Sequence, residues 1–334
     1  MELNQPWWID VIKAFIVVNL VLGAFAYLTW TERKVLGRMQ NRYGPNRAGP
    51  FGLLQPIADL VKLLRKASFE PAAGIDILYY AAPVVAGFTA LAAFSVIPFG
   101  GVWHWGSYDV TGWVVNVSIG LILLFSLSAI GIYAFVVGGW ASESKYSLLG
   151  AMRTCAQLVS YEVSLGLSVL GVVIMGQSLS LVDIAEKQQA TMWFVIPQFV
   201  GFIVFFISGI AETNRAPFDL PEAEQELVAG YHTEYSGMRF GLFQTAEYIN
   251  MVTLSGLAVT LFLGGWLMPF GIHPPNWVDP FVVLAKMWLV VILFIWIRAT
   301  LPRLRYDQLM SFGWKVLLPL ATINALVTAI VVVA

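Results

Sequence analysis

The chain has little of what a protein needs to hold a metal or a nucleotide. Cys155 is the only cysteine, which excludes an internal disulfide and a zinc or iron–sulfur site held by several cysteines. His104, His232 and His273 are scattered along the chain, which argues against a haem or a metal cluster. Neither a G-x-G-x-x-G nor a Walker-type phosphate loop occurs, so we expect no bound nucleotide.

Charged residues are also scarce. They make up 12% of the 334 residues, whereas hydrophobic residues make up 58%. Such a composition does not suit a water-soluble domain of this length. The formal net charge of −1 offers no basic surface for nucleic acid, so we expect no nucleic-acid partner. The first apolar run is too long and has no basic leader before it, so we expect no cleaved signal peptide.

Long apolar runs are what the chain does have. Runs of roughly 20 residues, the length needed to cross the hydrocarbon core, recur about eight times. They are Trp7–Trp30, Ile77–Pro98, Trp113–Val137, Leu148–Met175, Met192–Ile210, Phe240–Gly265, Val278–Ala299 and Phe312–Val333. We therefore predict an all-α polytopic membrane protein with about eight transmembrane helices. Residues 1–334 form a single integral membrane domain in this interpretation.

Lysine and arginine gather in alternate loops between these runs. The first, third, fifth and seventh loops carry them, the second and sixth have none, and the fourth has only Lys187. Because cytoplasmic loops retain such residues, the odd-numbered loops are predicted to face the cytoplasm. Both termini then lie on the opposite, periplasmic side. An odd number of spans would break this alternation.

The first cytoplasmic loop, residues 31–76, contains a candidate amphipathic helix. Within Phe51–Lys66, leucine, isoleucine and valine recur at spacings of three and four, and Asp59 and Lys62 fall on the other face. A basic amphipathic helix beside a membrane is expected to lie in the interface. The alternative is a solvated loop helix that packs on its own protein.

Carboxylates are concentrated in the fifth loop, residues 211–239, and at a few positions inside the apolar runs. The acids that we assign to proton handling are Glu162, Glu212, Asp219, Glu222, Glu224, Glu226, Glu234 and Glu247. A carboxylate at membrane depth is costly and marks a functional site. Glu222 and Glu224 also have an ordinary explanation, because Pro221 predicts a helix start where the dipole favours acids. Lys286 lies near the non-cytoplasmic end of its run, where we expect its amine to snorkel.

Several motifs, taken together and in order, resemble one family. The fifth loop reads Glu-Thr-Asn-Arg-Ala-Pro-Phe-Asp-Leu-Pro-Glu-Ala-Glu-Gln-Glu-Leu-Val-Ala-Gly-Tyr-His-Thr-Glu-Tyr-Ser-Gly from Glu212 onward. The others are Glu32-Arg-Lys, Arg42-Tyr-Gly-Pro-Asn-Arg47, Gln55-Pro-Ile-Ala-Asp-Leu-Val-Lys62, Ser160-Tyr-Glu-Val163 and Leu301-Pro-Arg-Leu-Arg-Tyr-Asp307. This set resembles the membrane-embedded H subunit (subunit 1 in mitochondria) of respiratory complex I, the proton-pumping NADH:quinone oxidoreductase.

The resemblance implies a role without a redox centre in this chain. Quinone would be the substrate, and NADH, FMN and iron–sulfur clusters would belong to partner subunits. The implied partners are the peripheral-arm quinone-site subunits and the small and antiporter-like membrane subunits, in a bacterial inner membrane. The implied quinone chamber includes Arg42, Arg47, Asp59, Lys62 and Arg215, and the eight acids would couple quinone reduction to proton translocation.

Three other interpretations stay open from the residues. A homologous membrane subunit of an ion-pumping hydrogenase would share the fold and several acids. A stand-alone secondary transporter would also place ionisable groups in its spans. A purely structural anchor would leave Glu162 and Glu247 unexplained.

Overall fold

The computed structural model describes residues 5–71, 74–106, 108–190, 192–219, 229–268 and 275–333. Glu222, Glu224 and Glu226, three of the predicted proton-handling acids, lie outside the described residues. His273 does as well.

Helices make up almost all of the described chain. The α-helices are α1 (Trp7–Met39), α2 (Gln55–Arg65), α3 (Asp76–Phe94), α4 (Gly120–Ala141), α5 (Lys145–Gly176), α6 (Leu181–Ala190), α7 (Phe199–Glu212), α9 (Gly237–Phe262), α10 (Asp279–Thr300), α11 (Tyr306–Phe312) and α12 (Leu318–Val333). Short 3-10 turns occur at η1 (Pro50–Gly52), η2 (Gly230–His232) and η4 (Asn276–Val278), and a π-helical turn, η5 (Gly313–Leu317), joins α11 to α12.

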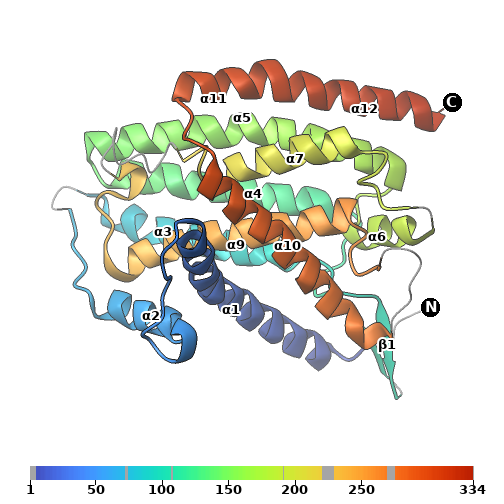
Figure 1. Ribbon diagram of the computed structural model, residues 1–334, viewed down its shortest axis with the longest axis horizontal. Coiled ribbons are helices and arrows are strands. Elements are labelled where there is room, and N and C mark those ends of the chain that lie inside the picture. Colours follow the sequence, from blue (N-terminus) through green and yellow to red (C-terminus); the bar gives the residue numbers. More distant parts are fainter. Residues whose placement is uncertain are drawn as a thin grey trace.

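One feature is not predicted by the sequence. The loop between α3 and α4 forms an antiparallel hairpin of β1 (Val102–Trp105) and β2 (Tyr108–Thr111), with His104 opposite Asp109. The hairpin has too few residues for its alternation to stand out beside the apolar runs. It lies at the same end of the molecule as the start of α1 and the end of α12 (Figure 1).

Six segments of the described chain are long and apolar enough to cross a membrane: α1, α3, α4, α5, the segment from η4 through α10, and the segment from α11 through α12. The prediction of a polytopic, helical membrane protein is therefore confirmed. Two predicted runs differ from the rest. The run Met192–Ile210 contains only the 14-residue α7, which begins after Pro197, where the missing N–H cannot continue a helical ladder. The run Phe240–Gly265 corresponds to α9.

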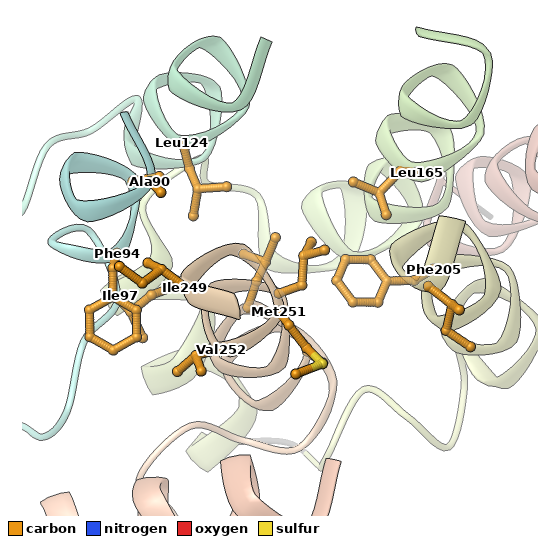
Figure 2. Close-up of a cluster of buried hydrophobic side chains, with 14 of the residues drawn as sticks. Ala90, Phe94, Ile97, Leu124, Leu165, Phe205, Ile249, Met251 and Val252 are labelled. Carbon is orange, nitrogen blue, oxygen red and sulfur yellow. The ribbon is translucent and has the colours of Figure 1, made fainter. Parts of the chain in front are cut away.

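Helix α9 is the centre of the fold. Of its 26 residues 19 are buried, whereas α12 buries three of 16. Figure 2 shows Ile249, Met251 and Val252 of α9 among Ala90 and Phe94 of α3, Leu124 of α4, Leu165 of α5 and Phe205 of α7. Since protein surrounds α9 on most sides, its serines, threonines and Glu247 meet other helices rather than hydrocarbon.

Helix α2 lies apart from the main layers of helices (Figure 1). None of its residues is buried, and Ile57, Val61 and Leu64 are each about half exposed or more on one face. It contacts α1 and α9 at its other side. The apolar stripe that the sequence predicts in Phe51–Lys66 is therefore present but is not packed on this chain.

Candidate functional site: carboxylates between the helices

Glu212, the last residue of α7, meets two other helices. Its Oε1 accepts a hydrogen bond of 2.6 Å from the Ser128 hydroxyl on α4. Its Oε2 is buried and has no hydrogen-bond partner among the described residues. Glu162 on α5 lies within electrostatic range of this carboxyl group. The structure thus brings two of the predicted acids together, and a hydroxyl binds one of them.

The chain directly after α7 is held by a single amide. Gln157 on α5 donates to the carbonyl of Ala211 at 2.7 Å and to that of Phe218 at 2.9 Å. Asp219, at the end of this described stretch, forms an ion pair of 2.7 Å with Arg303. Because buried backbone carbonyls need partners, Gln157 fixes the path by which residues 211–219 leave the membrane end of α7.

A second buried carboxylate, Glu32 near the end of α1, has a different environment. It is 4% exposed and forms an ion pair with Arg298 on α10. Its Oε2 also accepts a hydrogen bond of 2.6 Å from the Tyr248 hydroxyl on α9. Arg215 lies over the Tyr248 ring at 4.0 Å. A small enclosed cavity lined by Glu32, Arg215 and Arg298 lies at this junction of α1, α9 and α10.

Glu247 on α9 is the third buried carboxylate, at 3% exposed. Tyr231, in the turn η2, donates its hydroxyl to Glu247 at 2.7 Å. The turn can approach this closely because Gly230 lies against Gly150 of α5, where an added Cβ would sit 2.7 Å from backbone atoms. Next to Tyr231, burial lowers the pKa of His232 to about 4, so this imidazole is neutral at pH 7.

The residues predicted for the quinone chamber divide into two sets. Asp59 on α2 pairs with Arg33 of α1 at 2.7 Å and with Lys62 at 3.3 Å. Burial disfavours the Asp59 anion, but Arg33 and Lys62 outweigh it and hold the pKa of this carboxyl below its usual range. Arg42 and Arg47 are exposed, and Arg47 lines an open concavity with Tyr43 to Asn46. Arg215 is buried at the Glu32 cluster instead.

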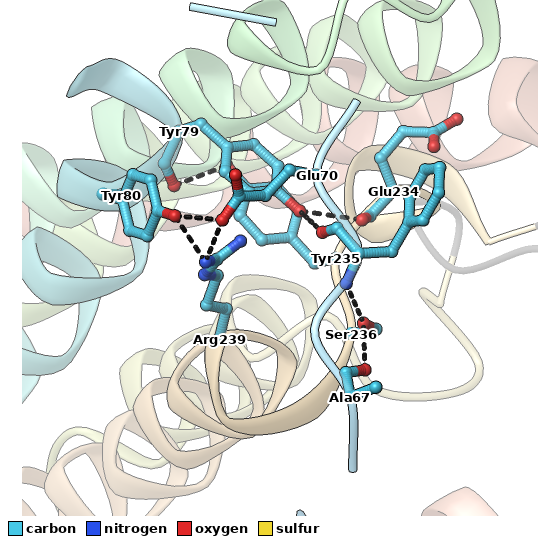
Figure 3. A network of polar contacts seen from close by, with 9 residues as sticks. Ala67, Glu70, Tyr79, Tyr80, Glu234, Tyr235, Ser236 and Arg239 are labelled. Atoms are coloured by element: carbon cyan, nitrogen blue, oxygen red, sulfur yellow. Dashed lines mark hydrogen bonds and ion pairs between the residues drawn. The ribbon is translucent and has the colours of Figure 1, made fainter. Parts of the chain in front are cut away.

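Glu234 contributes through its backbone. Its carbonyl accepts a hydrogen bond of 2.8 Å from the Tyr79 hydroxyl. The side chain of Glu234 points away from the surrounding polar network (Figure 3). The prediction of a proton-handling role for this carboxyl group stays a prediction.

Lys286 differs from the sequence expectation that it snorkels. Its ammonium group on α10 donates to the carbonyls of Leu263 at 2.7 Å and Gly265 at 2.9 Å, and also to Leu267. The Trp193 ring lies 4.5 Å from the same nitrogen. These carbonyls follow the last turn of α9 and have no further helical donors, so a cation there complements the helix dipole. Lys286 therefore caps the central helix from inside the protein.

Sequence reasoning missed Ser128, Tyr248 and the pairing of Glu32 with Arg298. Glu32 comes directly after the run Trp7–Trp30, and Arg298 ends the run Val278–Ala299. Both positions fall at the predicted cytoplasmic side with opposite charge, which was a usable signal. Ser128 carried none, because serines are common inside membrane helices.

The described residues contain no group of three or more His, Cys, Asp or Glu side chains that would hold a metal ion. The chemistry that these residues offer is that of carboxylates, hydroxyls and guanidinium groups enclosed between helices. The fold and these sites define a class: a polytopic helical membrane protein with ionisable groups embedded among its spans.

Comparison with known proteins gives the family. A family model described as NADH dehydrogenase matches residues 12–329. H subunit 1 of NADH-quinone oxidoreductase from Geobacter metallireducens is 52% identical over 96% of this chain and 95% of its own length. H subunit 2 from Syntrophobacter fumaroxidans is 52% identical over 95% and 93%, and the H subunit from Rhodospirillum rubrum is 48% identical over 97% and 94%. The chain belongs to this family of NADH-quinone oxidoreductase H subunits.

Membership carries several consequences. The chain is a multi-pass membrane subunit of an enzyme complex, and other subunits of complex I are its partners. The resemblance identified from the sequence motifs is thereby confirmed. The stand-alone transporter does not fit a subunit of this complex.

Proposed function

We propose that this chain helps to form a quinone-binding chamber and couples quinone reduction to proton translocation through its buried carboxylates. The relatives are named as quinone oxidoreductases, which motivates quinone as the substrate. NADH, FMN and the iron–sulfur clusters are assigned to partner subunits. This chain supplies binding surface and proton-handling groups.

The environment of Glu212 carries the coupling proposal. This carboxyl group lies between α4, α5 and α7 with a hydroxyl on one oxygen, an enclosed second oxygen and Glu162 nearby. Two neighbouring carboxylates disfavour simultaneous ionisation, so they titrate as a coupled set. A negative charge that appears nearby during quinone reduction shifts the proton population of such a set. Glu247, held by the Tyr231 hydroxyl, extends the same kind of environment to α9.

The chamber is proposed at the end of the molecule where α2, the end of α1 and Arg215 lie. Arg33, Asp59 and Lys62 join α1 to α2 there, and Arg298, Glu32 and Arg215 line a small cavity behind them. Guanidinium groups at this place would stabilise negative charge on a quinone during reduction. The exposed apolar face of α2 supports placing this helix in the membrane interface.

The membrane topology belongs to the same proposal. With α7 and α9 added to the six candidate segments, the chain would cross the membrane eight times, and both ends would lie on one side. Figure 1 shows the start of α1 and the end of α12 at the same end of the helical layers. The charge distribution of the loops then favours termini in the periplasm and a chamber on the cytoplasmic side.

The experiment replaces one carboxyl group in the assembled, membrane-reconstituted complex. Glu212→Gln keeps the shape and the Ser128 contact but cannot ionise. We expect normal assembly and unchanged NADH oxidation by an artificial acceptor, with a loss of protons pumped per NADH. Glu162→Gln and Glu247→Gln are expected to act in the same direction. The matched control is Glu186→Gln on α6, an exposed carboxyl group.

Undiminished proton pumping in Glu212→Gln, in a fully assembled complex, would show that this acid does not couple the reaction. Equal losses in Glu212→Gln and in the Glu186→Gln control would point to a general effect of charge removal instead.

A further inference from the structure

A polar network joins three segments beside α2. The segment after α2, residues 66–70, runs next to residues 234–239, which lead into α9. Arg239 pairs with Glu70 at 2.8 Å and donates to the Tyr80 hydroxyl on α3 at 2.7 Å. The Tyr80 hydroxyl in turn donates to Glu70. Figure 3 shows Arg239, Tyr80 and Glu70 as one closed set of contacts.

Aromatic rings enclose the Arg239 guanidinium. It lies 4.0 Å from the centre of the Tyr80 ring and 5.2 Å from that of Tyr79. The Tyr79 ring stacks on Tyr235 at 4.3 Å, and the Tyr235 hydroxyl donates to the carbonyl of Tyr79 at 3.2 Å. A guanidinium group that is both paired and stacked keeps a defined orientation, which a lysine or a glutamine does not reproduce.

A second row of contacts runs along the backbone. The Phe69 N–H donates to the Ser236 hydroxyl at 3.1 Å, and that hydroxyl donates to the carbonyl of Ala67 at 3.3 Å. The contact is close at Gly237, whose φ is +61°, and an added Cβ would lie 3.2 Å from the Lys66 carbonyl. The end of α2 therefore lies directly against the beginning of α9.

The network matters for α2 because the described chain holds this helix at few other places. Besides the network, α2 is held by the Arg33–Asp59 ion pair near its beginning and by apolar contacts such as Leu63 near Gly241. None of its residues is buried. The position of such a helix depends on the few directional contacts at its two ends.

We propose that Arg239 is a positioning residue for α2, and that its clamp on Glu70 and Tyr80 sets where this helix lies against the beginning of α9. The inference rests on the proposed function where it concerns quinone, because α2 borders the proposed chamber. The clamp partners Glu70 and Tyr80 are neither chamber residues nor proton-handling acids in that proposal. The effect of Arg239 on the reaction would pass through the placement of α2.

The test uses the assembled complex and measures the position of α2 separately from activity. Arg239→Gln removes the charge, and Arg239→Lys keeps the charge but loses the planar stack. Hydrogen exchange of the backbone amides in residues 57–70 is followed by mass spectrometry. We expect exchange about fivefold faster in Arg239→Gln, from the loss of one exposed ion pair and one cation–π contact, and an intermediate rate in Arg239→Lys.

The same variants are assayed for quinone reduction. A displaced α2 should raise the KM for quinone while kcat and NADH oxidation by an artificial acceptor stay close to the parent. Lys145→Gln, an exposed cation at the beginning of α5, is the matched control. Because Arg239→Gln reduces assembly if the clamp is needed for folding, Glu70→Gln and Tyr80→Phe serve as milder variants that remove one partner each.

The outcomes separate the two proposals. Faster exchange in residues 57–70 supports the positioning role, whether or not the KM changes. Faster exchange with an unchanged KM would mean that α2 does not border the quinone path, which contradicts the proposed chamber and leaves the clamp intact. Exchange equal to that of the parent in assembled Arg239→Gln, Glu70→Gln and Tyr80→Phe complexes would overturn the inference.

Discussion

Two buried carboxylates in this protein, Glu32 and Glu212, have opposite kinds of partner. Glu32 faces the permanent cation of Arg298 and the hydroxyl of Tyr248. Glu212 receives the hydroxyl of Ser128 and has a second carboxyl group, Glu162, nearby. A buried anion next to an arginine keeps its charge, whereas one beside a hydroxyl and another acid gains or loses a proton at modest cost.

The comparison teaches a division of labour. The Glu32 cluster joins α1, α9 and α10 and is suited to holding these helices in register around a fixed charge pair. The Glu212 cluster joins α4, α5 and α7 and is suited to changing its protonation. Location inside a membrane protein does not by itself distinguish these roles, because both carboxylates lie between helices. The partner of the carboxylate does.

The largest effect is expected at the Glu32 cluster. Arg298→Leu leaves Glu32 buried without its cation, and breaking a buried pair in this way costs about 3–5 kcal/mol. We expect the complex to lose thermal stability or fail to assemble, as measured by unfolding of the purified enzyme. The double variant Glu32→Gln with Arg298→Gln should recover part of the loss. A stable Arg298→Leu complex would show that Glu32 already exists without charge, and the comparison would fail.

A smaller effect is expected at the Glu212 cluster. Ser128→Ala removes the hydroxyl that donates to Glu212, and a hydrogen bond to a charged group contributes about 1.5–3 kcal/mol. We expect the assembled complex to pump fewer protons per NADH than the parent, but more than Glu212→Gln. The measurement is the proton-to-electron ratio in proteoliposomes, with Ser126→Ala, whose hydroxyl bonds its own helix, as the control. Equal pumping in both serine variants would mean that Glu212 does not depend on Ser128.

The pH dependence provides a third test, on the Tyr231–Glu247 side. Burial lowers the pKa of His232 from 6.5 to about 4, so the unfolded chain binds a proton more readily than the folded one between these values. The stability that neutral His232 contributes is thus present above about pH 6.5 and is lost as pH falls toward 4. We expect the parent to lose stability over this window, and His232→Phe to lose less. Thermal unfolding at a series of pH values measures this, and the exposed His104→Phe is the control.

The smallest effect is expected at the surface pair of α2. Asp59→Asn removes its ion pairs with Arg33 and Lys62, and exposed pairs contribute about 0.2–1 kcal/mol. We expect nearly unchanged stability. Quinone reduction should change if Asp59 borders the chamber, while NADH oxidation by an artificial acceptor should not. A large stability loss would place Asp59 with Glu32 as a structural ion pair.

Several parts of this molecule were predictable from local sequence. The spans at α3, α9 and α10 begin and end within a few residues of the predicted runs, because an apolar run signals a helix wherever the backbone must satisfy its own hydrogen bonds. The amphipathic stripe of α2 was equally clear. The family followed from motifs of consecutive residues, which need no tertiary information.

Other parts were beyond local reasoning. The end of α1 continues to Met39 past the predicted span, since charged residues do not stop a helix that protrudes from the membrane. The cap that Lys286 places on α9 depends on where α10 crosses it. The clamp at Arg239 depends on residues 169 positions apart in sequence, which no periodicity connects.

The sequence by itself determined that this protein is a helical membrane subunit of a known family with carboxylates near its helices. Those conclusions depend on composition, run length and contiguous motifs, which are properties of neighbouring residues. Only the tertiary structure decided which carboxylate meets an arginine and which meets a hydroxyl. Glu32 and Arg298 are 266 positions apart. Because lipid attracts all apolar helix faces alike, hydrophobicity does not select the neighbours of a helix, and the partners follow from close packing and polar contacts between helices.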